Sequence, residues 1–199
     1  MIYTYPLKLN FKLLALAPRL RVLDATGSEI FYIEQKLFAL KEAVKVFNNE
    51  TEKRLLFTIK ADRILDFGAR YYFHTPEGKL IGSIQKEGVQ SLFQASFTIF
   101  DANEQQLYKI TQSNPWIAFL DSLINSIPFA EFVTGFILNP IYVVKGSDAQ
   151  QSLARMKKQP SLFESQFAIT LTQTDIKADH ELILLLSFLM IVQLERNRG

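Results

Sequence analysis

The chain contains no cysteine, and this absence removes several classes of function at once. Disulfide bonds, thiolate metal sites, cysteine nucleophiles and palmitoyl anchors are all excluded. Only two histidines are present, His74 and His180, and neither belongs to a metal-binding or nucleophile motif. The glycines are scattered, so neither a phosphate-binding loop nor a dinucleotide fingerprint is present. We therefore expect a protein that is not an enzyme and that holds no metal and no cofactor.

The chain also lacks a dominant charge. Its 22 basic and 20 acidic residues give a net charge of +2, which is too small for a general polyanion binder. Its aromatic residues alternate with polar ones, as inward packing requires, so we expect no nucleic-acid partner. The chain does not open on a basic segment followed by an apolar one, so no secretory signal is predicted. We expect a cytoplasmic location, with association at a membrane surface as an option.

The apolar run near the C-terminal end is too short to span a membrane. Leu182–Val192 carries no charge and only one serine, but it covers 11 residues, whereas a membrane span needs about 20. A helix that is apolar on every side and too short to span is typical of a buried core. We predict this helix over 178–196, with Asp175 or Asp179 as candidate caps.

The chain is rich in short alternating segments separated by polar turns. In 69–74 and in 95–99, successive side chains alternate between two faces, which is typical of a half-buried strand. Similar apolar strand ends recur at intervals of 25 or 26 residues, at Ile33, Ile59, Ile84 and Ile110. Each interval fits one hairpin.

Twelve segments are predicted as strands by this alternation. They are 2–9, 19–23, 30–36, 43–47, 55–60, 69–74, 79–85, 95–100, 106–111, 141–145, 152–156 and 162–172. Repeated hairpins favour a sheet that closes on itself, because an open array leaves exposed edges. A large barrel needs its lumen filled, and the helix 178–196 would fill it. The sequence therefore predicts a mainly β fold: a single domain, 1–199, built as a closed antiparallel barrel around a hydrophobic C-terminal helix.

The segment 114–140 interrupts the hairpin series. It is rich in Phe, Ile and Leu and contains two acidic residues and no basic one. Apolar residues recur at helical spacing on both sides of Pro128, which predicts two short helices. They either pack on the barrel or form an apolar surface for a membrane or a partner chain. The candidate contact residues are Trp116, Phe119, Phe129, Phe132 and Phe136.

The sequence has one basic cluster, made of Arg155, Lys157 and Lys158. It is either a solvated loop before Pro160 or part of a lipid-binding surface. Each cation near an anionic membrane contributes about 1 kcal/mol to binding. If this cluster lies beside the segment 114–140, binding to anionic lipid gains support.

Residues 31–40, Phe-Tyr-Ile-Glu-Gln-Lys-Leu-Phe-Ala-Leu, resemble the opening of the LURP-one-related family. This family belongs to the tubby C-terminal-like superfamily and groups with the phospholipid scramblases. The resemblance covers residues 20–196 and lies in the order of the elements: the hairpin series, the turn 75–78 and the terminal helix. It implies a closed twelve-stranded barrel wrapped around a hydrophobic helix.

The chain departs from the scramblases in two ways. Their cysteine cluster is missing, and the stretch 174–181 lacks the regular acidic spacing and the glycine that a calcium loop needs. We therefore expect no calcium site.

The resemblance implies a non-enzymatic binding or membrane-tethering module. Because tubby relatives bind phosphoinositides, the implied ligand is an anionic phospholipid headgroup. Two alternatives stay open. One is an assembly module that forms a homo-oligomer through 114–140, and the other is a scramblase-like protein that perturbs lipids.

Overall fold

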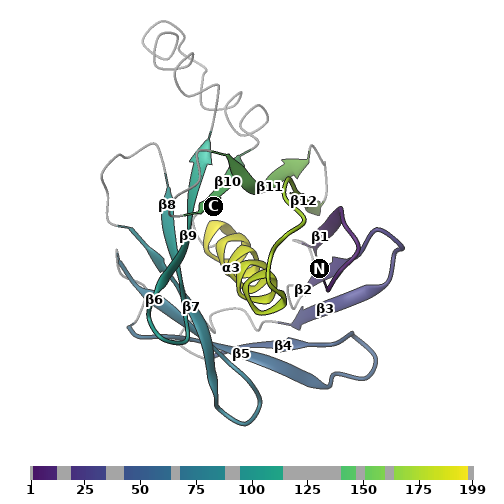
Figure 1. Cartoon of the computed structure of the whole chain (residues 1–199). Helices are drawn as coiled ribbons and strands as arrows, with labels where there is room; N and C mark the ends of the chain where they lie inside the picture. Colours follow the sequence, from purple (N-terminus) through teal and green to yellow (C-terminus); the bar gives the residue numbers. More distant parts are fainter. Residues whose placement is uncertain are drawn as a thin grey trace, which may run out of the picture.

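The computed structural model describes residues 2–12, 19–34, 43–63, 68–87, 95–113, 140–146, 151–159 and 164–196. The described residues form a mainly β protein with a helix inside the sheet (Figure 1). The elements are β1 (Leu7–Lys12), β2 (Arg19–Leu23), β3 (Glu29–Glu34), β4 (Val44–Phe47), β5 (Leu55–Ala61), β6 (Arg70–His74), β7 (Leu80–Lys86), β8 (Ser96–Asp101), β9 (Gln106–Ser113), β10 (Ile141–Gly146), β11 (Ser152–Gln159), β12 (Glu164–Leu171) and α3 (Ala178–Arg196).

The twelve strands form one closed antiparallel barrel. Each strand pairs with its neighbours in the chain, and β1 pairs with β12 to close the sheet. Closure leaves no free edge for pairing with another chain. The predicted fold class is confirmed.

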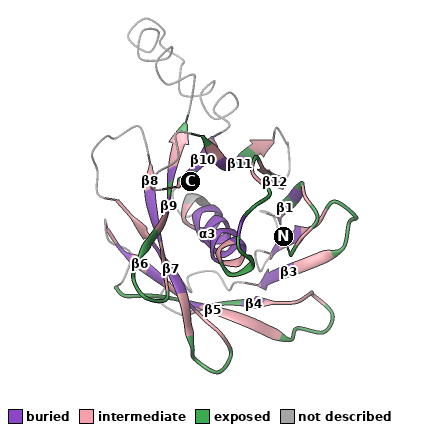
Figure 2. Cartoon of the chain, in the orientation of Figure 1, coloured by how far each residue is buried: buried purple, intermediate pink, exposed green. Residues whose placement is uncertain are grey.

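Alternation decides which side chains enter the barrel. In β6, Tyr71 and Phe73 are buried while Arg70 and Tyr72 face outward and stay partly exposed. The strands β2, β4 and β10 repeat this two-residue period, whereas β3, β7 and β8 each carry three buried residues in succession. Buried residues therefore surround the bore (Figure 2).

The helix α3 lies in that bore (Figure 1). Every residue from Ile183 to Gln193 is buried, which explains why the sequence shows no polar face on this helix. Ser187, the polar residue in the run, donates its hydroxyl to the carbonyl of Ile183 at 2.8 Å. The predicted helix 178–196 is confirmed.

The helix approaches the wall closely at Gly82 of β7. A Cβ at this position would lie 2.7 Å from the carbonyl oxygen of Phe100 and 3.0 Å from Cδ1 of Ile183. Glycine therefore allows α3 to lie against the wall formed by β6, β7 and β8.

The predicted first strand, 2–9, is misplaced: β1 begins at Leu7. The residues before it bind to the start of α3 instead. The buried carboxylate of Glu181 accepts hydrogen bonds from the backbone amides of Ile2, at 2.6 Å, and Tyr3, at 3.4 Å. Burial, together with the charge of Glu181, raises the pKa of the Tyr3 phenol to about 12.

The helices predicted within 114–140 cannot be compared with the structure, because residues 114–139 lie outside the described part of the chain. Pro140, which follows them, is buried, and its carbonyl accepts a hydrogen bond from the backbone amide of Lys158 at 3.1 Å.

Candidate functional site

Five exposed basic side chains lie on the outer face of one side of the barrel. This side consists of the neighbouring strands β1, β12, β11, β10 and β9. The five residues, which we call the cationic wall, are Lys8, Lys109, Lys145, Arg155 and Lys157. Lys8, Lys109 and Arg155 each sit between two buried residues. Lys145 and Lys157 each follow a buried residue, so the strand period directs all five side chains outward.

The strand register brings Lys8 and Lys157 to either side of one small residue. Lys8 of β1 pairs with Ala168 of β12, and Ala168 pairs in turn with Lys157 of β11. Two inter-strand steps separate the lysine backbones by about 10 Å. Arg155 lies two residues from Lys157 on the same face of β11, opposite Thr170.

The wall continues through β10 and β9. Lys145 of β10 pairs directly with Lys109 of β9, so two cations oppose each other across the ladder. Between this pair and Arg155 lies the uncharged residue Val143.

Acidic side chains are scarce on this side of the barrel. The side chains that the structure describes on these five strands include no Asp or Glu. The side chain of Glu164, at the start of β12, is not among the described side chains. Lys109 is paired with Glu87, which follows β7, at 2.9 Å. Within the described residues, no ion pair or side-chain hydrogen bond engages the other four cations of the wall.

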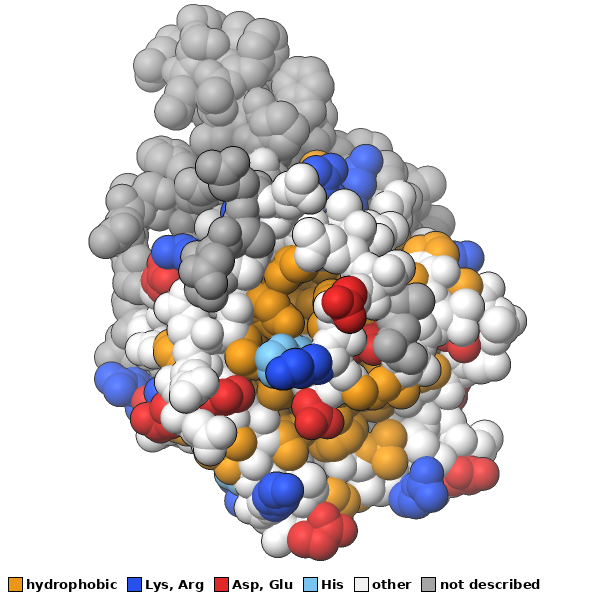
Figure 3. Space-filling model, viewed as in Figure 1, with side chains coloured by type: hydrophobic (Ala, Val, Ile, Leu, Met, Phe, Trp, Pro, Cys, Tyr) orange, Lys and Arg blue, Asp and Glu red, His pale blue; other side chains and the backbone are white. Residues whose placement is uncertain are grey.

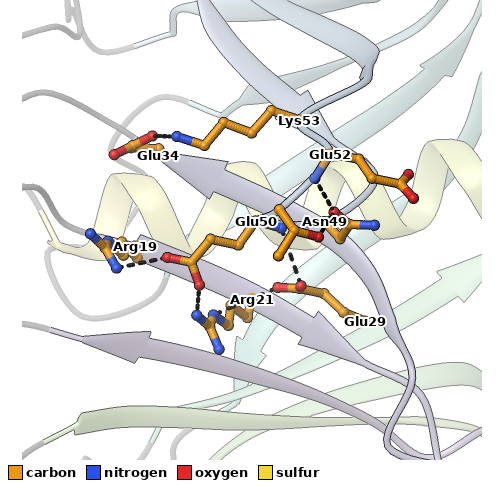
Figure 4. Close-up of polar contacts among 9 residues, drawn as sticks. Arg19, Arg21, Glu29, Glu34, Asn49, Glu50, Glu52 and Lys53 are labelled. Atoms are coloured by element: carbon orange, nitrogen blue, oxygen red, sulfur yellow. Dashed lines mark hydrogen bonds and ion pairs between the residues drawn. The ribbon is translucent and has the colours of Figure 1, made fainter.

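A second group of charges, on β2, β3 and the turn between β4 and β5, is internally paired (Figure 4). Glu50 binds Arg19 at 2.7 Å and also binds Arg21, and Lys53 binds Glu34 at 2.7 Å. The hydrogen bond from Lys53 lowers the pKa of the Glu34 carboxyl. These charges neutralise one another, so they are poor candidates for binding an external ion.

This paired group has a structural role at the weakest junction of the barrel. Tyr32 and Phe47 form the single residue pair that joins β3 to β4 in the described residues. The ion pairs connect β2 and β3 to the turn after β4, and Tyr32 is fully buried on that outer side. Side chains therefore close a junction that has little backbone pairing.

The end of the barrel at which α3 begins faces the viewer in Figure 3, and apolar side chains gather around it. At this end, Tyr108 of β9 shares a hydrogen bond with Nδ1 of His180 at 3.2 Å, and their rings meet edge to face. Burial raises the pKa of the Tyr108 phenol. The contact holds the first turn of α3 against strand β9. It pairs a phenol with an imidazole and does not resemble an activated nucleophile.

The structure separates the predicted basic cluster. Arg155 and Lys157 share the outer face of β11, whereas Lys158 lies on the opposite face of the strand, on the side of Ala154 and Met156. Adjacent residues of a strand point to opposite sides, so three basic residues near one another in sequence need not form one patch.

Three residues of the wall were missed at the sequence level, namely Lys8, Lys109 and Lys145. Their alternation with buried neighbours could have predicted that they face outward. Their proximity depends on the order of strands around the barrel, which brings the two ends of the chain together.

The described residues that flank the segment 114–139 lie close to Lys157 of the cationic wall. Ile141, at the start of β10, pairs with Lys157 on one side and with Ser113, the last residue of β9, on the other. The predicted contact residues Trp116, Phe119, Phe129, Phe132 and Phe136 are themselves outside the described residues.

Other kinds of site have less support. No group of three or more metal-ligating side chains occurs among the residues that the structure describes. In that same part of the chain, no helix has both the length and the apolar character needed to cross a membrane. Comparisons with protein-family models, curated proteins and solved structures find no match. The cationic wall is therefore the best candidate for a functional site.

Proposed function

We propose that this protein is a non-enzymatic module that binds anionic phospholipid headgroups at a membrane surface. The observation that carries the proposal is the cationic wall, where exposed cations gather away from acidic side chains. Unpaired cations attract an anionic surface, whereas charges already paired within the protein do so weakly. Lys8, Arg155 and Lys157 form the part of the wall in which no cation is paired with a described residue.

The expected affinity is modest. At about 1 kcal/mol for each cation, Lys8, Arg155 and Lys157 together favour the membrane-bound state by about 3 kcal/mol. Stable attachment to a membrane usually needs a second, apolar contribution. The sequence of 114–140 is strongly apolar. Ile141, which follows it, pairs with Lys157, and Ser113, which precedes it, pairs with Ile141 from the other side. This neighbourhood supports a combined electrostatic and apolar attachment.

Co-sedimentation with lipid vesicles tests the proposal. We expect the protein to pellet with vesicles that contain phosphatidylserine and to remain in solution with phosphatidylcholine alone. Binding should weaken as salt rises, because mobile ions screen exposed charges. Failure to bind vesicles that contain phosphatidylserine at low salt would overturn the proposal.

A pair of charge-reversal variants locates the site. Arg155→Glu/Lys157→Glu should abolish pelleting. Lys60→Glu/Lys79→Glu changes the net charge equally at exposed positions outside the wall, and it should retain most of the binding. Equal loss in both variants would show that net charge alone attracts the protein, and would contradict a site on the wall.

The same apolar sequence supports a second candidate, a subunit interface. In that case the protein should form a dimer in solution that dissociates on Phe132→Asp, measured by light scattering after size exclusion. A dimer together with no vesicle binding would favour the assembly function over the lipid-binding one.

A further inference from the structure

The geometry points to a cationic wall whose binding depends on the charge density of the membrane, through contacts with several headgroups. Glu87 is its counter-ion within the protein. This inference rests on the proposed function and deepens it. It assigns Lys109 and Lys145 to the same site as Lys8, Arg155 and Lys157.

The width of the wall supports contact with several headgroups. From Lys8 on β1 to Lys109 on β9 there are four inter-strand steps, which amount to about 19 Å along the sheet. Because these are four of the twelve steps around a closed barrel, the outward direction turns by about a third of the circumference between Lys8 and Lys109. Neighbouring cations, rather than the two ends of the row, can therefore contact adjacent headgroups of one membrane surface. The cations are also staggered along the strands, so they form a diagonal stripe across the sheet.

Across the ladders, Arg155 and Lys157 face three apolar residues and one hydroxyl group, that of Thr170. Ala168 lies between Lys8 and Lys157, and Val143 lies beside Arg155 on the next strand. Recognition of one particular headgroup requires several polar groups that converge on it. A row of separate cations on the outside of a barrel responds instead to the average density of negative charge.

The opposed lysines also indicate an external anion. Like charges directly across a ladder destabilise a sheet. Lys145 and Lys109 form such a pair, and Lys145 has no partner among the described residues. Glu87 offsets this repulsion at Lys109, so Lys145 is the side chain that an anionic surface would neutralise.

Glu87 neutralises part of the wall in the free protein. One of its carboxylate oxygens lies 2.9 Å from Nζ of Lys109, and the other accepts a hydrogen bond from the Thr98 hydroxyl at 2.6 Å. Burial works against ionisation, but the hydrogen bonds from Thr98 and Lys109 outweigh it and lower the pKa of Glu87. The carboxylate therefore stays charged at neutral pH and competes with the membrane for Lys109.

The first test varies the headgroup at constant charge. Vesicles containing phosphatidylserine, phosphatidylglycerol or phosphatidylinositol 4,5-bisphosphate would be matched in measured surface potential. We expect the three binding curves to coincide. A tenfold preference for one headgroup would overturn this inference and leave the proposed function standing, whereas no binding to any of the vesicles would overturn both.

The second test removes the counter-ion. Glu87→Gln should strengthen binding to phosphatidylserine vesicles about fivefold, because Lys109 becomes free for the membrane. Lys145→Gln should weaken it by a similar factor. Glu77→Gln, an equal charge change in the exposed turn between β6 and β7, is the matched control and should have little effect.

All variants would first be compared by thermal unfolding, so that binding is measured on folded protein. If Glu87→Gln does not strengthen binding more than Glu77→Gln does, or if Lys145→Gln binds as tightly as the unmodified protein, the inference is wrong.

Discussion

At the scale of single residues, Gly82 tests the contact between α3 and strand β7 of the barrel. Gly82→Ala would place a methyl group 3.0 Å from Cδ1 of Ile183 and closer still to the Phe100 carbonyl. Overpacking of this kind costs about 1–3 kcal/mol, so we expect a corresponding loss of stability in urea unfolding. Ile183→Val removes Cδ1, so the cost of Gly82→Ala should be smaller in that background. Strictly additive effects would contradict the contact.

Glu181 is the residue that holds the chain before β1. Glu181→Gln keeps an acceptor oxygen but loses the charge that strengthens the bonds from Ile2 and Tyr3. We expect faster hydrogen exchange in residues 2–5 and a destabilisation of about 1–3 kcal/mol. Asp179→Asn changes an exposed acid in the same turn and serves as control. The same exchange rates in both variants would argue against this role for Glu181.

At the scale of elements, the sequence predicts most of the strands because alternation and polar turns are local properties. The first strand shows where this reasoning fails. Tyr3, Tyr5, Leu7 and Leu9 continue one alternating pattern, yet only the later residues pair with another strand. Tyr3 and Tyr5 instead hydrogen-bond to Glu181 of α3, a contact between residues far apart in the chain that local periodicity does not reveal.

The junction between β3 and β4 should be the part of the barrel that opens most readily. Glu50→Gln removes the acceptor of Arg19 and Arg21 and should destabilise the protein by about 1 kcal/mol, since the group is partly exposed. Hydrogen exchange should accelerate in β4 first, and 1 M salt should have a similar effect through screening.

The matched control for this junction is Glu52→Gln in the same turn, where the carboxylate binds Asn48 and no described residue of β2 or β3. If both variants accelerate hydrogen exchange in β4 equally, or if exchange accelerates evenly over the whole barrel, the role of the ion pairs is contradicted.

At the scale of the whole molecule, a net charge of +2 conceals a segregation of charge. Acidic and basic residues pair on β2, β3 and the turn after β4, while the cationic wall occupies the side from β9 to β1. The hairpin series predicts a closed barrel, but the composition does not predict which charges it brings together. Lys8 and Lys157 become neighbours because closure inserts β12 between β1 and β11.

The enclosure of α3 within the closed barrel is the claim on which the position of every wall residue depends. The chain has no cysteine, so Ser187→Cys introduces a unique thiol at a fully buried position with almost the same shape. Its rate of reaction with a maleimide, measured under native conditions, tests the enclosure most directly. Our account predicts that labelling occurs only as fast as global unfolding, whereas Thr172→Cys, at an exposed position before α3, reacts at once. Equally rapid labelling at both positions would contradict it.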